Sequence, residues 1–272
     1  MAVCYRSFTN LRRPPMAEGG LALPMQPGST CDPRWRAQLE ALLALDERSL
    51  PSSDDEPMAD SDTQLWPLTY SIHAIAARFA DREDVYVSGD LFVHYVARRE
   101  AGMPVHGQIA PDVLVVFGVE DRVRDSYVVW REGKPPDFVM EISSNRSWRR
   151  DRIEKRTIYE AMGVKEYFIY DPREKFRPPR LIGLRLQQSR YREIPFEPMP
   201  NGKRGLRSTT LGLYARVDGG GRLRWFDPTG GGYLRTYEQL DRERRDAEQR
   251  QRAAEAELAR LREELRQGGR ND

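Results

Sequence analysis

Two acidic residues stand in apolar segments that are typical of buried strands. Asp112 follows Pro111 at the start of the run Val113–Phe117, and Glu141 lies inside the run Phe138–Ser143. An unpaired buried charge costs several kcal/mol, roughly, even after the surroundings relax. Two such carboxylates in one chain therefore predict that they share a cation.

The expected cation is a hard divalent ion, Mg²⁺ or Mn²⁺. Such ions take oxygen ligands and keep several waters, so Asp112, Glu141 and the backbone carbonyl of Ile142 would form a half-open site. A cation held there lowers the pKa of bound water and stabilises charge on a phosphate, which is the chemistry of phosphodiester hydrolysis. The three histidines have no metal-ligand spacing and are interpreted as structural; they are His73, His94 and His106.

A lysine near the carboxylates would orient the attacking water or offset phosphate charge. The position two residues after Glu141 is Ser143, and the next candidate is Lys155, on a helix predicted after the Glu141 strand. Lys155 has a simpler interpretation as a solvated helix residue. Asp90 follows Ser88-Gly89 and is either an ordinary turn residue or an outer acidic ligand of the metal.

Basic residues are concentrated between positions 145 and 156. Positive charge in the first turn of a helix opposes the helix dipole, so a phosphate-facing role is one explanation. An exposed, charged helix face is the other, and the sequence does not separate them. The candidate nucleic-acid contacts are Arg146, Arg149, Arg150 and Arg152.

The elements that must position these residues follow from the spacing of apolar residues. We expect a helix over residues 69–81 and another over 149–162 that ends at Gly163. The predicted strands cover 85–87, 91–96, 109–117, 138–143, 166–170, 181–187, 191–194, 211–217 and 223–226. Residues 127–131 are either a short helix or irregular.

The chain ends differ from its middle. Residues 1–62 are rich in Pro, Gly and Ser and are predicted to be disordered, with a short helix near 33–48. The folded domain is expected over 63–229. Residues 234–267 form a charged helix with coiled-coil spacing, which is either solvated or paired with a second copy or another helix. Its apolar heptad positions include Leu240, Ala247, Ala254 and Leu261.

Composition excludes some classes of protein. No apolar run approaches the roughly 20 residues that span a bilayer, and the N-terminus has no apolar segment typical of a signal peptide. Cys4 and Cys31 have no metal or disulfide pattern and are interpreted as free thiols. We therefore expect a cytoplasmic protein. The net charge of +2 gives no guidance on nucleic-acid binding.

The ordered series of motifs over roughly residues 62–215 resembles the Uma-type restriction endonucleases, a branch of the PD-(D/E)XK nuclease superfamily. The matching segments are Val87–Leu91, Ala110–Val113, Phe117–Val119, Ser126-Tyr127, Pro136–Ser144, Lys155, Tyr159, Gly163–Tyr167 and Tyr170–Pro172.

This resemblance implies an α/β (α+β) fold with a restriction-endonuclease-like mixed sheet flanked by helices. It also implies a magnesium-dependent endonuclease that acts on nucleic acid, most simply DNA. Asp112 matches the aspartate of the Pro-Asp motif, Glu141 the second acidic residue, and Lys155 the lysine that this branch carries on the following helix. Ser143 departs from the superfamily, where lysine is usual. An alternative therefore stays open: a catalytically degenerate protein that serves as an interaction or oligomerising module through its C-terminal helix.

Overall fold

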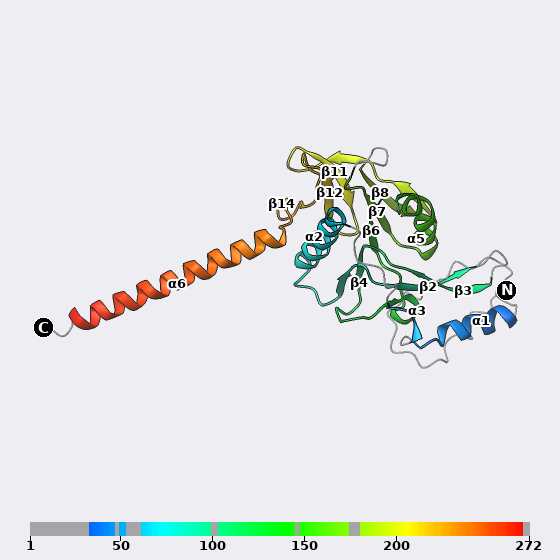
Figure 1. Cartoon of the computed structure of the whole chain (residues 1–272), viewed down its shortest axis with the longest axis horizontal. Helices are drawn as coiled ribbons and strands as arrows, with labels where there is room; N and C mark the ends of the chain where they lie inside the picture. The colour runs from blue at the N-terminus through cyan, green and yellow to red at the C-terminus, as the bar shows by residue number, and fades with distance from the viewer. Residues whose placement is uncertain are drawn as a thin grey trace.

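The structure, a computed structural model, describes residues 33–46, 49–52, 61–98, 103–144, 147–173 and 180–268. Figure 1 shows a mixed body of sheets and helices from which one long C-terminal helix extends. Both cysteines, Arg146 and the disorder predicted for residues 1–32 lie outside the described residues.

A six-stranded mixed sheet forms the centre of the body. Its strand order is β1-β4-β6-β7-β8-β9, in which β6 and β7 are parallel and every other neighbouring pair is antiparallel. The helix predicted after the Glu141 strand makes the crossover between the two parallel strands. The strands are β1 (Val85–Ser88), β4 (Val113–Phe117), β6 (Phe138–Ile142), β7 (Glu166–Tyr170), β8 (Leu181–Gln187) and β9 (Arg190–Glu193).

Two smaller sheets flank the central one. An antiparallel sheet contains β10 (Phe196–Pro198), β11 (Arg204–Ser208), β12 (Leu213–Val217), β13 (Leu223–Asp227) and β14 (Gly232–Tyr233). A three-stranded sheet contains β2 (Val93–Arg98), β3 (Pro104–Ile109) and β5 (Tyr127–Val128). In the latter sheet the Nδ1 of His94 lies 2.8 Å from the Nε2 of His106, which supports a structural role for both rings.

The helices include one that is wound in two ways. The helix between β6 and β7 runs as α4 (Trp148–Arg150), a π-helical turn η4 (Asp151–Lys155) and α5 (Arg156–Met162), and it ends at Gly163 in the left-handed conformation. The prediction of a helix over 149–162 is therefore confirmed, apart from the π-turn. The others are α1 (Pro33–Leu43), α2 (Asp62–Arg78), α3 (Val129–Glu132) and α6 (Tyr237–Gly268).

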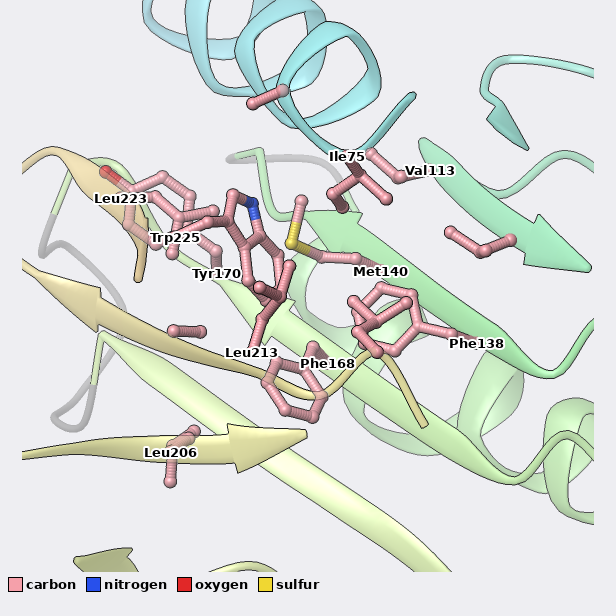
Figure 2. Close-up of a cluster of buried hydrophobic side chains, with 14 of the residues drawn as sticks. Ile75, Val113, Phe138, Met140, Phe168, Tyr170, Leu206, Leu213, Leu223 and Trp225 are labelled. Atoms are coloured by element: carbon pink, nitrogen blue, oxygen red, sulfur yellow. The ribbon is translucent and has the colours of Figure 1, made fainter. Parts of the chain in front are cut away.

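The central sheet separates two cores, and strand alternation assigns each residue of β6 to one of them. Phe138, Met140 and Ile142 point to the core that α2 and the β10–β14 sheet cover, where Trp225 packs against Phe138 and Phe168 (Figure 2). Val139 points to the opposite core, which contains Tyr159 of α5. Glu141 has the same parity as Val139, so its side chain lies on the α5 side.

Some sequence predictions were wrong in extent. The strand predicted over 109–117 is broken at residues 110–112, where the Pro111 turn separates β3 from β4. α2 begins at Asp62 and not at residue 69. The helix continues through Pro67, which lies inside it and is buried. The first helix ends at Leu43 and not near residue 48. Strands β3, β10, β11 and β14 were missed because they are short or polar.

The C-terminal helix α6 extends away from the body in Figure 1. Tyr237, Leu240, Leu258 and Leu261 are large apolar residues that it leaves exposed. No described helix is long and apolar enough to cross a membrane.

Candidate active site

Asp112 and Glu141 meet across neighbouring strands. β4 and β6 pair antiparallel with Val113 opposite Met140, and extending this register by one residue sets Asp112 opposite Glu141. Residues directly opposite one another in an antiparallel pair point to the same face of a sheet. Both carboxylates therefore lie on the face that the α4–η4–α5 helix covers. We call them the carboxylate pair.

The turn that carries Asp112 is held by backbone contacts. The backbone N–H of Ile142 donates a hydrogen bond to Asp112 Oδ2, and the N–H of Asp90 donates to the carbonyl of Pro111 at 2.9 Å. Gly89 packs so tightly against this turn that an added Cβ would lie 2.0 Å from the carbonyl oxygen of Asp112. The position of the Asp112 carboxylate thus depends on the absence of a side chain at residue 89.

Gly89→Ala is expected to move the Asp112 turn as well as to destabilise the fold. Overpacking of this kind costs roughly 1–3 kcal/mol, and the clash is with backbone that cannot rotate away. Urea denaturation and a Mn²⁺ titration of the same sample would check both effects. Gly219→Ala is the matched control, because a Cβ at residue 219 meets no described atom within 4 Å. A variant at residue 89 with wild-type stability and wild-type metal affinity would contradict this view of the turn.

Glu141 is buried and both of its oxygens are occupied. It is 1% exposed, the hydroxyl of Tyr159 donates to Oε1 at 2.6 Å, and the ammonium of Lys155 lies 2.6 Å from Oε2. Lys155 comes from η4 and Tyr159 from α5, one helical turn apart on the same face. The helix thus brings a cation and a phenol to a carboxylate in the middle of the sheet.

Ser143 has a different role from the lysine that is usual at its position. Its hydroxyl donates to Oδ2 of Asp151 at 3.0 Å, and the hydroxyl of Ser147 donates to the same oxygen at 2.8 Å. The other oxygen of Asp151 lies 3.4 Å from the Lys155 ammonium. Both Asp151 and Lys155 are buried, while Ile153 and Glu154 between them are exposed. The π-turn therefore directs both ends of this segment inward.

Burial governs the electrostatics of these groups. It raises the pKa of Asp112 to about 6, against the opposing effects of the Lys155 ammonium and the Ile142 N–H. It also raises the pKa of Glu141 well above its ordinary value, although Lys155 opposes this. For Lys155, burial alone would lower the pKa, but the carboxylates of Glu141, Asp151 and Asp112 outweigh it and raise the pKa. The lysine is thus charged throughout the neutral range.

The raised pKa of Asp112 predicts that the metal-free protein loses stability as pH rises. A carboxyl whose folded-state pKa exceeds its unfolded value stabilises the fold fully below pH 3.8, and this contribution is lost as pH passes through about 6. A rise in the Asp112 pKa of about two lowers the free energy of unfolding by about 3 kcal/mol at neutral pH. Asp112 is only half-buried, so solvent screening reduces this loss to roughly 2 kcal/mol.

Asp112→Asn should consequently be more stable than wild type at pH 7.5 in EDTA. The amide oxygen can still accept the Ile142 N–H, and residue 112 no longer carries a charge. Urea denaturation at pH 4.5 and pH 7.5 would measure the difference, which should grow with pH. A difference that shrinks with pH would show that the Asp112 carboxylate is stabilised in its charged form.

The donor set fits a hard divalent cation. The carboxylate pair supplies oxygen ligands, and the carbonyl of Ile142, the residue after Glu141, accepts a hydrogen bond from Gln64 Nε2 at 3.3 Å. Among the described residues, no three or more His, Cys, Asp or Glu side chains are grouped so as to hold a metal. A site of two carboxylates with remaining positions for water is the coordination that Mg²⁺ favours.

The other predicted site residues are Asp90 and the arginines between positions 145 and 156. Asp90 is exposed in a bend with a left-handed φ of 50°, and its role as an outer ligand stays a prediction. Arg149 and Arg150 are exposed at the start of the helix, and Arg152 is half-buried. Arg150 lies 3.9 Å from Glu154.

Two residues in contact with the candidate site were missed or undervalued in the sequence. From the sequence, Asp151 had no assigned role, and Tyr159 was only one of the residues that carry the family resemblance. Their spacing contained a signal, because they lie four residues before and four residues after Lys155. Side chains four apart on a helix share a face, so this spacing could have placed all three in the same surroundings.

Comparisons with known proteins identify the family to which the chain belongs. Residues 62–217 match a family of restriction-endonuclease-like proteins, whose description is "Putative restriction endonuclease". The match spans more than half of the chain, and the chain therefore belongs to this family, Uma2. The resemblance stated from the motifs is confirmed, as is a mixed α and β fold.

A likeness to one solved structure is slight. That structure is described as a putative nuclease belonging to DUF820 from Anabaena variabilis ATCC 29413 and is 15% identical to this chain. The alignment covers 54% of this chain and 76% of that chain, with a TM-score of 0.37. No curated protein matches the chain significantly.

Proposed function

We propose that this protein is a divalent-metal-dependent nuclease that hydrolyses phosphodiester bonds, with DNA as its substrate and Mg²⁺ or Mn²⁺ as its metal. The observation that supports the proposal most is the carboxylate pair. Its members are opposite one another on neighbouring strands and on the same face of the sheet, and the Lys155 ammonium lies 2.6 Å from Glu141. Membership of a family of restriction-endonuclease-like proteins supports the same reaction class.

Each residue has a distinct task in this proposal. Asp112, Glu141 and the carbonyl of Ile142 would hold the cation, which supplies an activated water and stabilises charge on the phosphate. Tyr159 fixes one oxygen of Glu141 and so sets the direction of the other. Lys155 keeps its charge at neutral pH, so it offsets phosphate charge or orients water and does not act as a base.

The entry to α4 is proposed as the surface that contacts nucleic acid. Arg149 and Arg150 are exposed there, a short distance along the chain from Lys155, and Arg152 follows on η4. Guanidinium groups near a cleavage site position the phosphate backbone without reading its sequence. Arg146 belongs to the same proposal, although it lies outside the described residues.

Cleavage of supercoiled plasmid by the purified full-length chain tests the proposed reaction. We expect nicked and linear products with Mg²⁺ or Mn²⁺, and none when EDTA is added. A single-stranded DNA and an RNA of matched length would measure substrate preference. Absence of cleavage of every substrate with both metals would contradict the proposal.

A second candidate function, self-association, rests on α6. This 32-residue helix extends from the body and exposes Leu240, Leu258 and Leu261. In a parallel, in-register pair, the flanking heptad positions would bring Arg250 beside Glu255 and Glu257 beside Arg262 of the second copy. Arg244 and Gln251 lie in the seam and weaken it. We propose a weak coiled coil between two copies.

Removal of α6 is expected to convert a particle of two chains into one of a single chain. Size-exclusion chromatography with light scattering would compare the full chain with one ending at Thr236, which keeps β14 and its pairing with β13, at high protein concentration because the seam is weak. Leu258→Glu in the full chain is the point-variant control and should also give the smaller mass, since it sets a charge in the seam. The same number of chains per particle in all three proteins would contradict self-association through α6.

A further inference from the structure

Asp151 is a buried carboxylate with one oxygen left over. The residue is 1% exposed, and its Oδ2 accepts hydrogen bonds from the hydroxyls of Ser143 and Ser147. Its Oδ1 is buried and has no hydrogen-bond partner among the described residues. The nearest cation to Oδ1 is the Lys155 ammonium, at 3.4 Å. A buried acceptor without a partner in a native site calls for an explanation.

Lys155 therefore has two carboxylates within reach. Its closer contact, at 2.6 Å, is with Glu141, which is one of the two proposed metal ligands. An ammonium and a divalent cation on the same carboxylate repel each other strongly where water is scarce. For a cation to bind Glu141 well, the Lys155 ammonium must be held by another acceptor, and Lys155 is buried.

The charges of the site agree with such an exchange. The site holds three carboxyl groups, those of Asp112, Glu141 and Asp151, and one ammonium, so it can carry two negative charges more than Lys155 offsets once a cation favours ionisation. One divalent cation balances them. Buried charges persist when they are paired in this way.

We infer that Asp151 is a positioning residue that receives the Lys155 ammonium when a divalent cation binds Glu141. This inference rests on the proposed function. Asp151 is prepared for this role, because the two serines fix Oδ2 and the hydroxyl of Tyr167 donates to its backbone carbonyl at 2.7 Å. Ser143, which stands where the superfamily usually has lysine, thus holds Asp151, and Asp151 in turn would hold Lys155.

Direct ligation of the metal by Asp151 is the competing explanation. The described residues contain no group of three His, Cys, Asp or Glu side chains arranged to hold a metal, which disfavours it. The two explanations differ in their dependence on Lys155. If Asp151 acts through Lys155, removing the lysine makes Asp151 irrelevant to metal affinity, whereas a direct ligand would keep its effect.

Calorimetric titration of the full-length chain with Mn²⁺ in the absence of nucleic acid tests the inference. Asp151→Asn should weaken Mn²⁺ binding roughly tenfold or more, the usual effect of losing a residue that orients a metal site. Lys155→Met should bind Mn²⁺ at least as tightly as wild type. The double variant should match Lys155→Met. Ser147→Ala, a milder change that keeps the Asp151 charge, should lie between wild type and Asp151→Asn, and thermal melts would verify folding of each.

The outcomes separate the inference from the proposed function. Unchanged Mn²⁺ affinity in both Asp151→Asn and Ser147→Ala, with wild type binding normally, would overturn the inference and leave the nuclease proposal standing. An Asp151→Asn effect of the same size in the Lys155→Met background would overturn it in favour of direct ligation. Wild type that binds no Mn²⁺ would overturn the proposed metal site and the inference with it.

Discussion

Glu141→Gln is expected to lower metal-dependent DNA cleavage by a factor on the order of 10²–10³, the usual effect of losing one preorganised stabiliser of transition-state charge. The side chain keeps its size, and the Tyr159 hydroxyl can still donate to the remaining oxygen. What disappears is one of the two anionic ligands and the partner of Lys155. Initial rates of plasmid nicking at saturating Mg²⁺ would measure the effect.

Two comparisons strengthen this test. Asp112→Asn should cause a loss of similar size, because the pair acts as one unit. Glu154→Gln is the matched control, since Glu154 is an exposed carboxylate on the outward side of η4 and should cleave at the wild-type rate. A Glu141→Gln protein that cleaves as fast as the Glu154→Gln control would remove Glu141 from the site.

Lys155→Met is expected to slow cleavage by a factor on the order of 10²–10³ without weakening Mn²⁺ binding, because a preorganised positive charge is lost. The lysine stays charged at neutral pH and contacts the carboxylate pair through Glu141, so its loss removes positive charge from the reacting centre. Metal affinity should hold or improve because a competing cation is gone. Single-turnover cleavage and calorimetry on the same preparation would separate the two effects.

The control for this variant is an exposed lysine, and Lys203→Met serves, since Lys203 lies in the turn before β11. It should change neither rate nor metal affinity. Parallel losses of rate and Mn²⁺ affinity in Lys155→Met would mean that the lysine only supports the fold of the site. Cleavage by Lys155→Met at the wild-type rate would mean that Lys155 has no role in the reaction.

The sequence predicted the identity of the principal site residues better than their contacts. Asp112 and Glu141 were noticeable because acidic residues are costly in apolar strands, and that argument needs no structure. Lys155 was nominated as the next lysine after the Glu141 strand and by its match to the family's lysine. Its 2.6 Å contact with Glu141 could not be predicted, and neither could the π-turn that ends at Lys155, which has no simple signature in the residues. Asp151 was overlooked because an aspartate among arginines reads as one half of a surface ion pair.

The same contrast applies to the fold. Strand β7 was predicted with its full extent, since an apolar run bounded by Gly163 and Pro172 admits few alternatives. Strand β3 was missed because Pro104–Ile109 contains a histidine, a glycine and a glutamine, and its pairing with β2 is a tertiary effect. The division of the chain at 62 and 229 and the pairing of α6 stay predictions.

Diffraction from a crystal soaked in MnCl₂, recorded at the manganese absorption edge, tests the central claim most directly. The claim is that Asp112 and Glu141, which strand pairing brings together, coordinate a single divalent ion. We expect one anomalous peak at roughly 2.0–2.2 Å from an oxygen of each side chain. Manganese bound only elsewhere, or the two side chains bridged solely by Lys155 at saturating metal, would contradict it.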